Sequence, residues 1–97
     1  DEYHKTGVLY SFTKAKASPG IPGEWNTLEI TLDENRTLVH VNGILVTCFS
    51  EGDPVPAKVK SYEPERGPRP QSGYIGLQNH GGEDVVYFKE ISYQPLD

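Results

Sequence analysis

Residues 24–50 read EWNTLEITLDENRTLVHVNGILVTCFS, and this stretch decides the fold. Leu28, Ile30 and Leu32 alternate with polar residues. Successive side chains of a strand point to opposite faces of its sheet, so this alternation is typical of a strand with one apolar face. The pattern predicts a strand over residues 24–33.

The turn signals that follow this strand predict two hairpins in series. Asp33-Glu34-Asn35 forms a polar turn before a second alternating run over residues 36–41. Asn42-Gly43 comes next, and this dipeptide suits a type I′ hairpin because both of its residues tolerate a positive φ. An apolar run over residues 43–49 then predicts a third strand, which completes an antiparallel meander.

The rest of the chain shows no window with helical spacing of apolar residues. Further strands are expected over residues 7–12, 73–79 and 84–93, with a bulge at Lys89-Glu90 that would correct a slip in the alternation. Residues 50–72 hold Pro54, Pro56, Pro64, Pro68 and Pro70 and predict a long loop. The expected fold is all-β, an antiparallel β-sandwich or jelly roll.

The length and composition of the chain argue against several classes of protein. A chain of 97 residues forms at most one domain, and a net charge of −5 without a basic cluster argues against a nucleic-acid partner. No apolar run approaches the length of a membrane span. The single cysteine, Cys48, lies in the apolar third strand, where we expect a small buried hydrophobe. The chain begins at Asp1 without a signal-like segment, which leaves its compartment open.

Candidate site residues come from the face opposite the aliphatic side chains, because the sequence holds none of the strong local motifs of catalysis or nucleotide binding. Strand parity places on this face Trp25, Glu29 and His40 from the meander, Tyr74, Gln78 and His80 from residues 73–80, and Lys89 beside the expected bulge. A sugar has CH-rich faces that stack on aromatic rings, and hydroxyls that bond to carboxylates and amides. His80 stands out because Gly81-Gly82 leaves room for a ligand or a metal ion. A solvated sheet face is also polar by default, so a plain surface is the alternative.

Several blocks in order resemble the signature of one family. They are Gly23 to Ile30, Val41-Asn42-Gly43, Gly73 to Gly81, and Val86 to Ile91. Together they resemble the 3-keto-disaccharide hydrolase domain family, whose members adopt a concanavalin A-like, laminin G-like jelly roll. The resemblance implies a secreted or periplasmic bacterial protein that acts on oxidised glycosides. It also implies that the chain corresponds to the C-terminal part of a longer domain.

The resemblance also implies a chemistry. The family's blocks fall on Trp25 and Glu29, and on Gln78 and His80, while the family often has arginine where this chain has Lys89. A 3-keto group acidifies the C2 proton, so His80 or Glu29 could abstract it while Lys89 or a bound divalent cation stabilises the enolate. The glycosidic group then leaves by elimination, and water adds afterwards.

Two functions remain open at this stage. An enzyme would need His80 and Glu29 to converge in a cleft, with its site completed by a missing N-terminal part. A non-catalytic carbohydrate-binding or protein-interaction module would instead present Trp25 and Tyr74 as an open platform. The six expected strands are few for a jelly roll, so we expect open sheet edges through which the chain could form a homo-oligomer.

Overall fold

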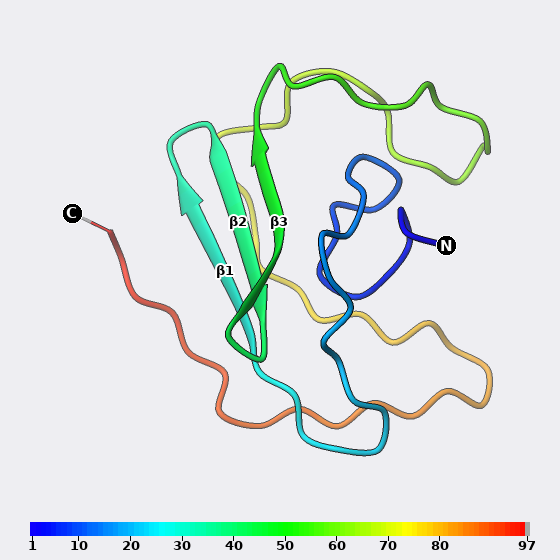
Figure 1. The fold of residues 1–97 in the computed structure, drawn as a ribbon, viewed down its shortest axis with the longest axis vertical. Coiled ribbons are helices and arrows are strands. Elements are labelled where there is room, and N and C mark those ends of the chain that lie inside the picture. Colours follow the sequence, from blue (N-terminus) through cyan, green and yellow to red (C-terminus); the bar gives the residue numbers. More distant parts are fainter. Residues whose placement is uncertain (97) are drawn as a thin grey trace.

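The computed structural model describes residues 1–96 and is all-β, as expected, with no helix among them. The strands are β1 (Leu28–Asp33), β2 (Arg36–Val41) and β3 (Ile44–Ser50). They form one antiparallel sheet in the order β1-β2-β3 (Figure 1). The predicted meander is therefore confirmed, although its first strand begins at Leu28 rather than at residue 24. No helix in the described part of the chain could cross a bilayer.

The two hairpin turns have left-handed residues where the sequence places its turn signals. Asn42 and Gly43 have φ of 51° and 79°, as a type I′ turn requires. In the first turn Glu34 has a φ of 55°, a conformation that costs a residue with a Cβ more than it costs glycine. The turn at Asn42 is also tied to the chain before β1, because its backbone N–H donates to the carbonyl of Thr27.

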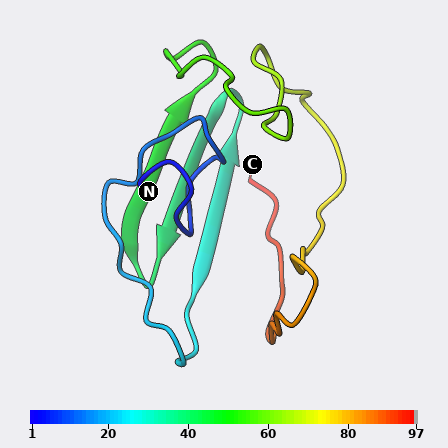
Figure 2. The same cartoon turned by 90° about the vertical axis from the view of Figure 1, so that its right-hand side faces the viewer.

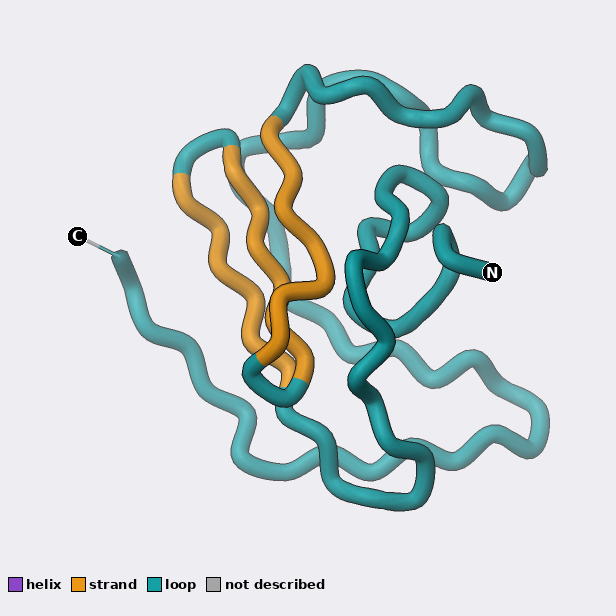
Figure 3. The backbone as a smooth tube through the Cα atoms, viewed as in Figure 1, coloured by secondary structure: helices purple, strands orange, loops and turns teal. Residues whose placement is uncertain are grey.

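Three other predicted strands are wrong for this structure, in which residues 7–12, 73–79 and 84–93 pair with no strand (Figure 3). Residues 7–12 form tight turns with φ of 95° at Gly7 and 61° at Ser11, closed by local bonds such as Phe12 N–H to Leu9 O. In the two C-terminal stretches the apolar side chains are exposed. Alternation of apolar and polar residues indicates which side chains a strand would bury. A strand also needs a neighbouring segment whose main-chain groups can hydrogen-bond to its own, and these stretches have none among the described residues.

A bulge occurs in a different place from the one predicted. The register of β2 and β3 shifts between Val39 and His40, which leaves Val46 as the extra residue of β3. At the predicted position Glu90 has a φ of 55°, but no strand is formed there that could contain a bulge. The bulge turns Val46 towards the core, where it is fully buried.

The core lies on one face of the sheet and is built from Val39, Val41 and Val46, against which Val8 and Ala15 of the N-terminal segment pack. Figure 2 shows this segment (blue) lying across β2 and β3, while the C-terminal run (orange to red) is separate from it. The segment is held by Thr47 Oγ1, which donates to Gly7 O at 2.6 Å, and by Lys16 N–H, which donates to Val46 O.

On the opposite face of the sheet the described residues form no hydrophobic cluster of this kind. Cys48 pairs with Leu38 on that face and is exposed, so the prediction of a buried thiol is wrong. The physical reason is parity, because Thr47 and Phe49, the neighbours of Cys48 in the strand, are the residues that point into the core. Glu29 and His40, which are paired across β1 and β2, share the uncovered face with Cys48.

Candidate functional site

The open sheet face carries two of the candidate site residues, an acid and an imidazole. Glu29 of β1 lies directly opposite His40 of β2, so both side chains leave the same face of the sheet. Glu29 is exposed and His40 is half-buried. The ring nitrogen Nδ1 of His40 is buried without a hydrogen-bond partner among the described residues. The sequence thus placed these two side chains correctly.

Trp25 and Lys89 meet although the chain separates them widely. The Lys89 ammonium lies 4.3 Å from the centre of the Trp25 ring, which is within the range of a cation–π contact. The indole side chain remains 60% exposed. The sequence pattern placed Lys89 in a strand that the structure lacks, and it did not predict the contact with the Trp25 ring.

Asparagine side chains fix the loop that carries Trp25. Asn26 Oδ1 accepts from Ile21 N–H at 2.9 Å, and its Nδ2 donates to the carbonyls of Ile21 and Glu24. Asn42 Nδ2 donates to Asn26 Oδ1 at 2.8 Å, and Asn42 Oδ1 accepts from Thr27 N–H. The turn between β2 and β3 therefore holds the two residues that follow Trp25, and Asn26 in turn holds Glu24 before it, which gives the indole a defined place at the end of the sheet.

His80 lies in a turn rather than at the end of a strand. Gly81 and Gly82 have φ of 99° and 64°, and Gly81 N–H donates to Asn79 Oδ1. His80 Nδ1 lies 3.9 Å from Asp84 Oδ2, and the His80 side chain is 89% exposed. The two glycines adopt left-handed φ values, and solvent rather than a cleft surrounds the His80 ring.

The predicted catalytic residues do not converge. No hydrogen bond or ion pair joins His80 to Glu29 within residues 1–96. Tyr74 and Gln78 are also exposed, with Tyr74 fully accessible to solvent. Among the described residues no cluster of His, Cys, Asp or Glu could hold a metal ion.

The hollows of the molecule lie elsewhere. One, of about 410 Å³, lies beside β3 and is lined by Tyr3, Phe12, Lys14, Lys16 and Phe49, among others. A second, of about 360 Å³, lies between His4, Tyr10 and the loop around Tyr62. Neither is lined by His80 or Glu29.

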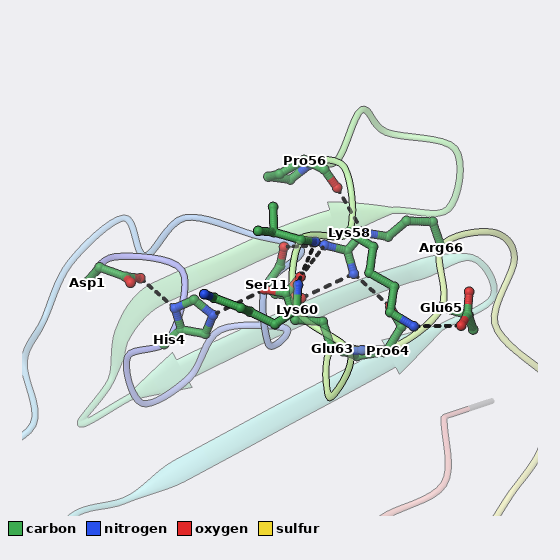
Figure 4. A network of polar contacts seen from close by, with 11 residues as sticks. Asp1, His4, Ser11, Pro56, Lys58, Lys60, Glu63, Pro64, Glu65 and Arg66 are labelled. Carbon is green, nitrogen blue, oxygen red and sulfur yellow. Dashed lines mark hydrogen bonds and ion pairs between the residues drawn. The ribbon is translucent and has the colours of Figure 1, made fainter.

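A polar network between the N-terminal segment and the long loop was not expected from the sequence (Figure 4). Glu63 is 8% exposed, and its Oε1 accepts from the main-chain N–H groups of Val59 and Lys60. These bonds lower the pKa of Glu63 because they stabilise the carboxylate. Arg66 donates to Ser11 Oγ at 3.2 Å and lies over the Phe12 ring. The network closes the loop onto the N-terminal segment.

A second network joins the same loop to the sheet. Arg69 binds both carboxylate oxygens of Glu51, and its Nη2 donates to Thr37 Oγ1 at 3.0 Å. The guanidinium also lies 5.4 Å from the centre of the Phe49 ring. Nothing in the sequence marks Arg69 except its charge within a proline-rich stretch, so these contacts are visible only in the folded chain.

Comparison with known proteins gives one match. No curated protein and no solved structure matches the chain. Residues 1–94 match the sequence profile of the 3-keto-alpha-glucoside-1,2-lyase-like domain, the same family that the ordered sequence blocks resemble. Since the match spans nearly all of its residues, this chain belongs to the 3-keto-alpha-glucoside-1,2-lyase-like domain family.

Proposed function

We propose that the chain recognises glycosides oxidised at C3 and binds them on the open surface around Trp25 and Lys89. The contact between the exposed indole and the Lys89 ammonium at 4.3 Å is the observation that carries this proposal. The indole offers an apolar face to the CH-rich side of a pyranose, and the ammonium can donate to the ketone oxygen. Family membership supplies the substrate class.

The exposure of the candidate residues favours binding over complete catalysis. Trp25, Tyr74 and His80 are all exposed, whereas catalysis by elimination benefits from a site that excludes water. An open platform can still bind a sugar, because stacking and a few hydrogen bonds do not need an enclosed cavity. We place this sheet within a concanavalin A-like jelly roll, and the chain in a secreted or periplasmic bacterial protein; the family resemblance supports both placements.

The binding proposal can be tested with the intrinsic reporter of the chain. Trp25 is the single tryptophan, so a 3-keto-glucoside is expected to change the fluorescence of the wild-type chain in a saturable way. The parent glucoside has a C3 hydroxyl in place of the ketone, and its tetrahedral carbon directs the oxygen away from the position of the ketone oxygen, so its bond to Lys89 should be poorer and its binding about tenfold weaker.

Variants followed by amide chemical shifts give the matched controls. Trp25→Ala should weaken binding by about tenfold, the loss expected for one stacked ring, and Lys89→Ala should abolish the preference for the ketone. Lys5→Ala removes an exposed lysine far along the chain and should leave both properties unchanged. Equal binding of both sugars by the wild-type chain would contradict the proposal.

A second candidate function is the elimination reaction itself, with His80 as the base that removes the C2 proton. The specific observation in its favour is the position of Asp84, whose carboxylate lies 3.9 Å from His80 Nδ1 and can stabilise the imidazolium that forms when the ring takes the proton. His80 takes the C2 proton, the electron pair of that C–H bond forms the C1–C2 double bond as the C1–O bond breaks, and the departing oxygen takes a proton from water, which yields a conjugated enone and a free alcohol.

Enone formation from a 3-keto-glucoside, followed by ultraviolet absorbance, measures this activity directly. His80→Ala should reduce turnover at least a hundredfold if His80 is the base, whereas His4→Ala should retain it. Loss of turnover in Glu29→Gln with full activity in His80→Ala would assign the base to Glu29. Ligand binding without any enone would leave the binding proposal standing and refute this one.

A further inference from the structure

The outer edge of β1 exposes its main chain. Thr27 O accepts from Asn42 N–H at 2.8 Å, so the main-chain groups of Thr27 point towards β2. The direction in which main-chain N–H and C=O groups point alternates from one residue of a strand to the next. The main-chain groups of Leu28, Ile30 and Leu32 therefore point away from β2. On that side the described residues provide no further strand.

The same three residues expose their side chains. Leu28, Ile30 and Leu32 are 54%, 57% and 67% exposed in the whole chain. They lie opposite Val41, Val39 and Thr37 in the register, and so they belong to the core face of the sheet. The N-terminal segment covers this face over β2 and β3 and leaves the part formed by β1 open.

The two edges of the sheet differ in whether their main-chain groups are free to pair with another strand. At the β3 edge, Val46 O already accepts from Lys16 N–H, and the extra residue in β3 distorts the ladder. Bulges of this kind protect an edge from pairing. The β1 edge has no bulge and no proline, so it is the edge that can accept another strand.

We propose that the β1 edge binds β1 of a second copy of this chain, antiparallel, with Ile30 opposite Ile30 of the other copy. In this register Leu28 lies opposite Leu32 in both directions, so all the apolar side chains gather on one face. The residues whose main-chain groups point outwards face one another and exchange hydrogen bonds. The two sheets become one continuous sheet with a two-fold axis at Ile30.

The charges of the strand fit this register. Glu29 lies opposite Thr31 of the second copy, and Asp33 lies opposite Thr27, so no carboxylate faces another directly. In this register the apolar residues of the two strands face one another, and each carboxylate lies opposite a threonine. Since each copy carries a net charge of −5, association should strengthen when salt rises from about 20 mM to about 300 mM.

Single cysteines on the edge test the register. In a Cys48→Ser background, Ile30→Cys should form a disulfide-linked dimer under mild oxidation, since directly opposed residues have Cα atoms about 5.5 Å apart. Leu32→Cys is the matched control on the same strand and face. Its Cα atom lies about 14 Å from that of the other Leu32, four residues along the strand and one strand spacing across, so it should cross-link at least tenfold more slowly.

Sedimentation of the wild-type chain tests the association itself. The chain should dimerise in a concentration-dependent way, and Ile30→Lys should weaken the dimer at least tenfold while the circular dichroism of the monomer is retained. Thr31→Lys places the same charge on the other face, opposite Glu29 of the second copy, and should keep the dimer.

Three outcomes would overturn the proposal. One is a wild-type chain that remains monomeric at high micromolar concentration, and another is cross-linking of Leu32→Cys as fast as that of Ile30→Cys. The third is slow hydrogen exchange at the amides of Leu28, Ile30 and Leu32 in the monomer, since this would mean that another segment of the same chain covers the edge.

Discussion

Replacing Gly7 with alanine is expected to lower the free energy of unfolding by about 3 kcal/mol. Gly7 has a φ of 95°, and a Cβ built on it would lie 3.0 Å from side-chain atoms of both Val41 and Val46. The methyl group would strain the backbone and push the N-terminal segment away from the core. The same residue supplies the carbonyl that accepts from Thr47, so the displacement would also weaken a partly buried hydrogen bond.

Alanine variants of two other glycines distinguish the cost of backbone strain from the cost of the steric clash at Gly7. Gly23 has a φ of 82° with open space around it, so Gly23→Ala should cost only the backbone strain, about 1 kcal/mol. Gly20 has neither a left-handed φ nor a close neighbour, and Gly20→Ala should change stability by less than about 0.5 kcal/mol. Urea unfolding of the three variants measures the series. An equal loss for Gly7→Ala and Gly23→Ala would contradict the close packing of the N-terminal segment on the sheet.

Arg69→Ala is expected to cost about 2 kcal/mol at pH 7, the value typical of hydrogen bonds to a charged group. The change removes the guanidinium bonds to the Glu51 carboxylate but keeps the main-chain N–H bond of residue 69 to Glu51 Oε1. It also leaves Thr37 Oγ1, on a residue that is 3% exposed, without its donor. Lys58→Ala is the matched control. It breaks an ion pair of 2.6 Å with Glu65, whose side chain is 86% exposed, and such surface pairs contribute little to stability.

The Arg69 effect should depend on pH. The side-chain and main-chain hydrogen bonds from Arg69 lower the pKa of Glu51 in the folded chain. A carboxyl group whose pKa is lower folded than unfolded stabilises the fold above the unfolded value and loses this contribution as pH falls through the folded value. The difference between wild type and Arg69→Ala should therefore be full at pH 7 and shrink below about pH 4.

Unfolding in urea at pH 7, 5 and 3 measures this dependence. Arg69→Ala should still lose stability in acid, because the pKa of Glu63 is lowered independently by main-chain N–H groups. A difference between the two proteins that stays constant down to pH 3 would show that the contribution of Arg69 comes from packing on Phe49 rather than from the Glu51 carboxylate.

The local pattern of residues 28–50 was sufficient to predict the meander. Alternation in β1 and β2 and the Asn42-Gly43 turn each act over a few residues, so neighbours in the sequence carry the whole signal. The same reasoning failed for residues 7–12, 73–79 and 84–93. Their alternation describes strands with one apolar face, but pairing depends on a partner that a local pattern does not specify.

The parts of the candidate site that lie within the meander could also be predicted from the sequence, and the parts outside it could not. Parity within regular strands placed Glu29 and His40 together, because cross-strand register follows from the turn between them. The contact between Trp25 and Lys89 spans most of the chain and could not be derived from either neighbourhood. His80 was expected beside the sheet, but its position depends on how residues 73–80 cross the molecule, and the structure leaves it in solvent.

An antiparallel meander with an aliphatic face and a polar face follows from the order of the residues alone, because turn chemistry and period-2 alternation are local. The buried share of the aliphatic face depends instead on how distant segments of the chain pack. The close approach of Gly7 to Val41 and Val46 places the N-terminal segment over β2 and β3. Leu28, Ile30 and Leu32 stay exposed on β1, because burial requires a covering segment and a strand pattern does not say where that segment lies.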